Sequence, residues 1–169
     1  ERTLKGVVYT YLAALEQNEG AYEQKEDGSV WKGEYDISHS EAIADSIKAD
    51  GGVDVTFFYG KTRFMTSVKN DKGERIVGTD ASDEVIEAVL NKGETMFSTH
   101  VLVNGLDFYG YYVPVFQEGT NEAIGMVFAG LPHDEGLATF NAIMKVLLIT
   151  TVIVIVIAAV IGIFSSNNT

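Results

Sequence analysis

The fold is decided by residues 95–116, which read TMFSTHVLVNGLDFYGYYVPVF. The dipeptide Asn104-Gly105 separates two runs that are rich in β-branched and aromatic residues. Asn-Gly favours a two-residue turn because both residues accept the positive φ angles that such a turn requires. The stretch therefore predicts two antiparallel strands, over residues 95–103 and 106–116, and an antiparallel sheet around them.

Further strands are predicted on both sides of this hairpin. Apolar and aromatic runs bounded by turn residues indicate strands over residues 53–59, 63–69, 74–78 and 123–130. Tight turns are expected at residues 60–61 and 70–73. The sequence thus predicts an antiparallel sheet of five to six strands.

Three helices are predicted before and between these strands. Apolar residues repeat at helical spacing over residues 3–19. Ser38 with Glu41 fits a capping box and predicts a second helix that ends near residue 49. Asp80 or Ser82 caps a third helix. Helices and strands are segregated rather than alternating, which indicates an α+β fold.

The C-terminal part contains an uncharged run of nineteen residues, 146–164. As a helix it spans about 28 Å, close to the thickness of the bilayer hydrocarbon. No Gly or Pro interrupts residues 137–161, so one helix is expected to run from Asp134 through this candidate transmembrane segment. The expected organisation is a folded domain over residues 1–133, a linker and transmembrane helix over 134–164, and a tail over 165–169.

Composition excludes several classes of function. The net charge is −12, with 24 acidic and 12 basic residues, which disfavours binding to nucleic acid or to anionic lipid surfaces. There is no cysteine, so disulfides and thiolate metal sites are excluded. The histidines His39, His100 and His133 have no metal-ligand spacing. No catalytic motif stands out, so we expect neither an enzyme nor a cofactor or metal site.

Four stretches together resemble the single Cache family of PAS-like sensor domains. They are residues 54–63 (DVTFFYGKTR), 73–79 (GERIVGT), 109–115 (YGYYVPV) and 124–130 (IGMVFAG). The resemblance covers about residues 4–132. Cache domains are extracytoplasmic sensors of bacterial chemoreceptors, sensor kinases and cyclic-dinucleotide enzymes.

This resemblance implies a small-ligand sensing domain of a transmembrane chemoreceptor in the cell membrane, with the sensor extracytoplasmic. It implies a small carboxylate or amino acid as ligand and a signal passed through the C-terminal helix. We also expect a homodimer, because two copies side by side would let their N-terminal helices pack together. The first helix should cover one face of the sheet and follow an upstream membrane span. The segment over residues 26–49 should cover the other face and the ligand. The alternatives are the sensor of a kinase or cyclic-dinucleotide enzyme, or a membrane-anchored interaction module without a small ligand.

Two arginines on neighbouring predicted strands are candidate ligand contacts. Arg63 and Arg75 can each grip a carboxylate through two parallel hydrogen bonds. A position equivalent to Arg75 is similar to a ligand arginine of citrate-sensing relatives. The alternative is a structural ion pair with an acid such as Asp54 or Glu74, or exposure to solvent at a sheet edge.

Aromatic residues of the strands are further candidates. Alternation sends Tyr109 and Tyr111 to one face of the sheet. It sends Phe108 and Tyr112 to the other face. One face is expected to be core and the other to line a ligand pocket, although core packing explains both equally well. The remaining candidate ligand-binding residues are Phe57, Tyr59, Thr66, Tyr109, Tyr111 and Tyr112.

Overall fold

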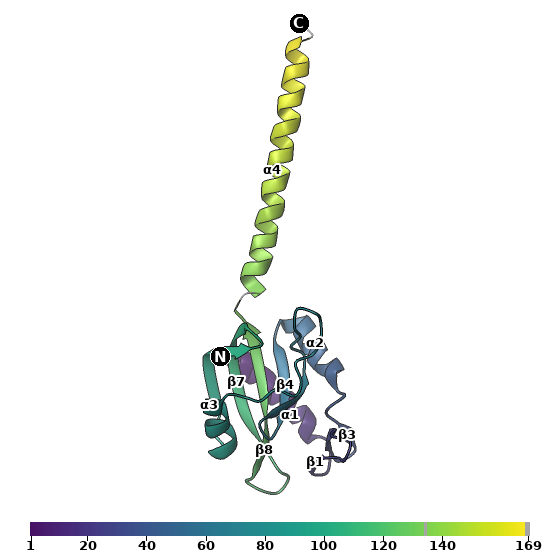
Figure 1. The fold of residues 1–169 in the computed structure, drawn as a ribbon, viewed down its shortest axis with the longest axis vertical. Coiled ribbons are helices and arrows are strands. Elements are labelled where there is room, and N and C mark those ends of the chain that lie inside the picture. Colours follow the sequence, from purple (N-terminus) through teal and green to yellow (C-terminus); the bar gives the residue numbers. More distant parts are fainter. Residues whose placement is uncertain (134, 168–169) are drawn as a thin grey trace. The chain divides into compact units, whose positions relative to one another are not determined.

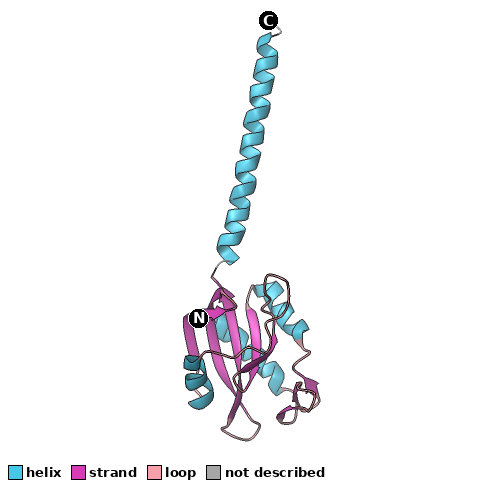
Figure 2. Cartoon of the chain, viewed as in Figure 1, coloured by secondary structure: helices cyan, strands magenta, loops and turns pink. Residues whose placement is uncertain are grey.

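The structure is a computed structural model that describes residues 1–133 and 135–167, with side chains described for 1–133 and 143–161. The chain divides into two compact units, Glu1–Pro132 and His133–Thr169. The first unit contains strands and short helices, and the second contains one long helix (Figures 1 and 2). The fold is α+β with an antiparallel sheet, as the sequence predicts.

The first unit is organised around a five-stranded antiparallel sheet with the order β5-β4-β8-β7-β6. The hairpin prediction is confirmed, because Val103 pairs with Leu106 across Asn104 and Gly105, whose φ angles are 50° and 80°. The strands are β4 (Asp54–Tyr59), β5 (Thr62–Thr66), β6 (Met96–Val103), β7 (Leu106–Phe116) and β8 (Ala123–Pro132).

One face of this sheet, which we call the helix face, packs against α1 (Arg2–Glu16) and α2 (Glu41–Gly51). Figure 1 shows α1 behind the sheet. Its buried residues follow helical spacing and form one apolar cluster with strand residues such as Phe57 and Val127. The buried residues of α1 are Leu4, Val8, Tyr11 and Leu15.

The expectation that residues 26–49 cover the opposite face is wrong. Val30, Ile37 and Ala44 are fully buried in the same cluster as the residues of α1. Both helices therefore share the helix face, since each has a single apolar stripe and this cluster buries both stripes.

A second, three-stranded sheet lies between α1 and α2, where the sequence analysis predicts no strand. It consists of β1 (Tyr22–Gln24), β2 (Val30–Lys32) and β3 (Tyr35–Asp36). Gln117, in the turn after β7, accepts from the Tyr22 N–H at 2.8 Å and donates to the Tyr22 carbonyl at 2.8 Å. This side chain fastens the small sheet to the large one.

The opposite face of the large sheet, which we call the cavity face, carries a second apolar cluster. Here α3 (Asp83–Val85) continues into the π-helical segment η1 (Ile86–Asn91). Ser82 is the N-cap of α3, and its hydroxyl accepts from the Val85 N–H at 3.5 Å. The buried members of this cluster are Phe58, Val68, Val85, Val89, Val103, Phe108, Tyr112, Met126 and Phe128.

Two local predictions are wrong. Residues 74–78 form no strand, because the chain bends where the Val77 N–H donates to the Arg75 carbonyl. The Ser38 capping box also fails. The Ser38 hydroxyl accepts from the Val30 N–H at 2.7 Å, and α2 begins after Ser40 instead.

The second unit contains α4 (Glu135–Asn167). Asp134, where the sequence places the start of this helix, lies outside the described residues. Residues Ile143–Ile161 are long and apolar enough to cross a membrane, with a mean hydropathy of 2.8, and none of this segment is buried. A core helix of a soluble protein would bury most of such a surface, so this helix is a candidate membrane span.

Candidate functional site

A β-bulge brings Arg63 to the cavity face. On β5, Met65 pairs with Phe57 and Arg63 pairs with Phe58, so Phe64 is an extra residue between the two pairs. Phe57 lies on the helix face and Phe58 on the cavity face. Simple alternation would place Arg63 on the same face as Met65. The bulge reverses this and turns the guanidinium toward the cavity face.

The environment of Arg63 is unusual for a cation. The residue is 5 % exposed, and its Nε atom is buried without a hydrogen-bond partner. Nη1 donates to the Thr79 hydroxyl, and the guanidinium carbon lies 4.9 Å from the centre of the Phe58 ring. Arg63 forms no ion pair with any residue that the structure describes. Burial lowers the pKa of the guanidinium below its usual value, since the charge has lost much of its water.

Arg63 lines a partly open cavity of ≈ 290 Å³ on the cavity face. Its walls come from β6, from Tyr112 in the middle of β7 and from the segment that begins α3. The lining exposes more polar than apolar surface, whereas most small-molecule sites are predominantly apolar. The lining residues that carry polar side chains are Arg63, Asp80, Ser82, Glu84, Ser98, His100 and Tyr112.

Tyr112 connects this site to the core. It is 3 % exposed, and its ring packs against Phe128 with the ring centres 4.8 Å apart. Burial raises the pKa of Tyr112 to about 12, although the nearby charge of Arg63 acts in the opposite direction. The phenol is therefore neutral at physiological pH and can donate a hydrogen bond into the cavity.

A larger hollow of ≈ 630 Å³ also reaches Arg63, from the side of the small sheet. It lies between the β1–β2 turn, the start of α2 and β5, and it is more open to solvent than the first cavity. We take the less open cavity as the candidate ligand site, because a charge–charge contact strengthens as its exposure to water decreases.

Arg75 lies in a different arrangement. Its Nη1 and Nη2 donate to the two carboxylate oxygens of Asp45 on α2, at 2.8 and 2.6 Å. Nη1 also donates to the Thr66 carbonyl at 3.0 Å. This bidentate pair fastens the segment after β5 to α2, and Arg75 does not line the cavity with Arg63. Arg75 therefore forms a structural ion pair, which was the alternative to a ligand contact, and its partner is Asp45.

The other predicted ligand residues lie apart from Arg63. Phe57 and Tyr111 are buried on the helix face, where Phe57 stacks on Tyr22 with the ring centres 6.0 Å apart. Tyr59 packs against Phe64 on that face. The Thr66 hydroxyl is buried at 2.7 Å from that of Thr56, and Tyr109 is 39 % exposed. Of the eight candidates, Arg63 and Tyr112 line the candidate ligand cavity and the other six do not.

The alternation predicted for β7 is confirmed. Tyr111 belongs to the cluster of the helix face, and Phe108 and Tyr112 belong to the cluster of the cavity face. The sequence does not indicate Asp80, Glu84 and Ser98 as site residues, although all three line the cavity. They have no shared motif, and the cavity forms only when β6 and the start of α3 meet β5 in space.

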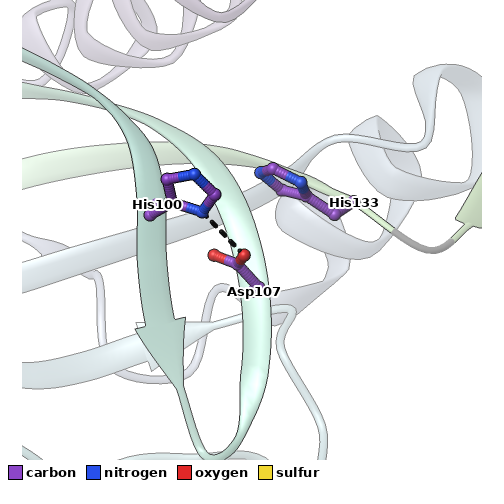
Figure 3. Close-up of side chains that lie close together, drawn as sticks. All are labelled: His100, Asp107 and His133. Carbon is purple, nitrogen blue, oxygen red and sulfur yellow. Dashed lines mark hydrogen bonds and ion pairs between the residues drawn. The ribbon is translucent and has the colours of Figure 1, made fainter.

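The histidines form two described ion pairs within the first unit. His39 Nδ1 lies 2.8 Å from Asp36 Oδ2, and this carboxylate raises the pKa of His39. His100 Nδ1 lies 2.9 Å from Asp107 Oδ2, across the β6–β7 hairpin (Figure 3). His133, also labelled in Figure 3, is the first residue of the second unit, and we assign no metal site to this group.

Comparison with known families places this fold in a class of sensor domains. A family model described as single cache domain 3 matches residues 35–143, more than half of the chain. The chain therefore belongs to the single Cache domain 3 family, which confirms the resemblance seen in the sequence. No curated protein matches the chain.

Proposed function

We propose that the first unit is a non-enzymatic, ligand-binding sensor of a transmembrane chemoreceptor, and that it binds a small carboxylate at Arg63. The observation that carries this proposal is a buried guanidinium that lines a cavity and forms no ion pair with the described residues. A buried, unpaired charge destabilises a fold. An anionic ligand that binds from solution would pair with the Arg63 guanidinium and offset this cost. A carboxylate supplies that partner with two parallel hydrogen bonds.

The size of the cavity supports a small metabolite. A volume of ≈ 290 Å³ lies at the lower end of the range for small-molecule pockets. Thr79 holds the guanidinium in place before the ligand arrives, and Phe58 covers one of its faces. Such preorganisation reduces the entropy lost when the ligand binds.

Signal transfer follows from the order of elements along the chain. Tyr112 contacts Phe128 of β8, and β8 is the last strand before α4. In our proposal a ligand on Arg63 and Tyr112 favours one packing of this aromatic pair, and α4 carries the change through the membrane. A shift of this kind requires that the ligand bind the two packings with different affinity.

We also propose that the receptor is a homodimer that associates through α1. Tyr9 on this helix is 43 % exposed and borders a shallow, mostly apolar hollow with Leu12 and Ala13. Light scattering in detergent tests this idea. A dimer that Tyr9→Glu converts to a monomer supports it, and an unaltered dimer contradicts it.

The ligand test is calorimetry on the full chain in detergent with a panel of mono- and dicarboxylates and amino acids. Micromolar to millimolar binding by a carboxylate, lost in Arg63→Met and kept in Arg75→Met, supports the proposal. If no compound in the panel binds, the interaction-module alternative is favoured. If the best binder is unaffected by Arg63→Met, the site is wrong.

A further inference from the structure

The cavity that Arg63 lines also contains a charge of opposite sign. Glu84, on α3, lines the cavity together with Arg63. Its carboxylate forms no hydrogen bond or ion pair with the residues that the structure describes. The other lining acid, Asp80, is engaged by Lys61 Nζ at 2.9 Å and by the Thr62 hydroxyl at 2.8 Å.

The two unpaired charges differ in depth. Arg63 is 5 % exposed, whereas Glu84 is an exposed residue of the same lining. A ligand whose carboxylate reaches Arg63 shares the cavity with this negative charge. A second anionic group is repelled there, and an ammonium group is attracted.

We propose that Glu84 determines the ligand class: it selects zwitterions that carry one carboxylate and one ammonium group, and it disfavours dicarboxylates. This inference rests on the proposed binding of a carboxylate at Arg63 and adds the second contact. A zwitterion neutralises both charges, whereas a dicarboxylate neutralises one and faces the other.

The expected effect of Glu84 on ligand affinity follows from its exposure to water. Measured charge pairs at exposed positions change affinity by factors of up to about five, because water screens them. We therefore expect Glu84 to alter the preference between ligands of different charge by about three- to fivefold, and Arg63 to control binding of all of them.

The test uses two size-matched triplets, titrated by calorimetry into the full chain in detergent. The first triplet is L-alanine, propionate and malonate, and the second is L-norvaline, valerate and glutarate. In the native protein the amino acid of a triplet is expected to bind most tightly and the dicarboxylate most weakly. Glu84→Gln should lower the ratio of amino-acid to dicarboxylate affinity by about three- to fivefold.

Glu23→Gln is the matched control, because Glu23 is an exposed residue of β1 that does not line the cavity. If Glu84→Gln and Glu23→Gln alter the ratio equally, or if the dicarboxylates bind the native protein best, Glu84 does not select the ligand. In that event Arg63-dependent binding still supports the proposed function. If Arg63→Met leaves all binding intact, or if no ligand of either triplet binds the native protein, both proposals fail for these ligands.

Discussion

Arg75 donates to both carboxylate oxygens of Asp45, at 2.8 and 2.6 Å, and this pair joins the segment after β5 to α2. Arg75→Met is expected to destabilise the first unit by about 1 kcal/mol at neutral pH, since both side chains are partly exposed to water. Chemical denaturation in detergent measures the change. Arg2→Met, on the exposed start of α1, is the control and should have little effect.

The same pair predicts a pH dependence. Arg75 lowers the pKa of Asp45 in the folded state, chiefly through the hydrogen bond to its carboxylate. The stabilisation is therefore present above the unfolded pKa of an aspartate, about 3.9, and is lost as pH falls through the lower folded value. The stability difference between the native protein and Arg75→Met should be constant from pH 7 to 5 and shrink below pH 4. A difference that grows on acidification would contradict this assignment.

Gly110 and Gly130 face each other across β7 and β8, and the Phe128 ring lies over both. A Cβ atom on Gly110 would lie 2.7 Å from Phe128 Cε2, and one on Gly130 would lie 2.4 Å from Phe128 Cζ. Either glycine-to-alanine change should destabilise the unit by about 1–3 kcal/mol through overpacking. Gly6→Ala on α1, where a Cβ meets nothing within 4 Å, should stabilise it instead. Equal effects at Gly6 and Gly110 would refute this packing.

Lys48 donates to both oxygens of Asp54 at 3.0 Å, and Asp54 is fully buried on β4. Lys48→Met leaves that carboxylate with the Ser67 hydroxyl as its other described partner, and should destabilise the fold by about 2–3 kcal/mol. Lys61→Met breaks an exposed pair of similar length with Asp80 and should have little effect. Thermal unfolding of the two variants in parallel checks the contrast, and equal losses would contradict it.

Much of the framework follows from local patterns. Helical spacing in α1, the Asn104-Gly105 turn and the alternation of Tyr111 and Tyr112 each depend on neighbouring residues, and each was predicted correctly. Ser38 is a case in which a local pattern predicts the wrong contact. Its hydroxyl is used by Val30, eight residues away, so a capping pattern in the sequence has no cap in the fold.

The site depended on features that no local pattern reveals. Because Phe64 is an extra residue in β5, the Arg63 side chain lies on the cavity face. Simple alternation from Met65 would place it on the helix face. Asp45 was not identified as the partner of Arg75, because it lies thirty residues earlier on another element. The sequence predicts both arginines as ligand contacts, and only the packing separates the paired Arg75 from Arg63, which forms no described ion pair.

The candidate membrane span predicts that charged substitutions near its centre impair membrane insertion. Replacing Ile153 and Val156 together by arginine should impair insertion, since each arginine near the centre of a span costs about 3 kcal/mol. Alkaline extraction of membranes after expression measures the result. The native chain should stay in the membrane pellet, and the double variant should be extracted. Thr150→Ser with Thr151→Ser serves as the control, and retention of the arginine variant would argue against a membrane span.

The most direct test of the central claim compares thermal unfolding of the native chain and Arg63→Met, with and without the best-binding carboxylate. Without ligand, Arg63→Met should unfold at the same or a higher temperature, because it removes a buried cation that forms no described ion pair. With ligand at about one hundred times its dissociation constant, only the native protein should gain stability, by about 2.7 kcal/mol. A variant that unfolds several degrees lower without ligand and still gains stability from the carboxylate would show that Arg63 is a structural residue and not the ligand contact.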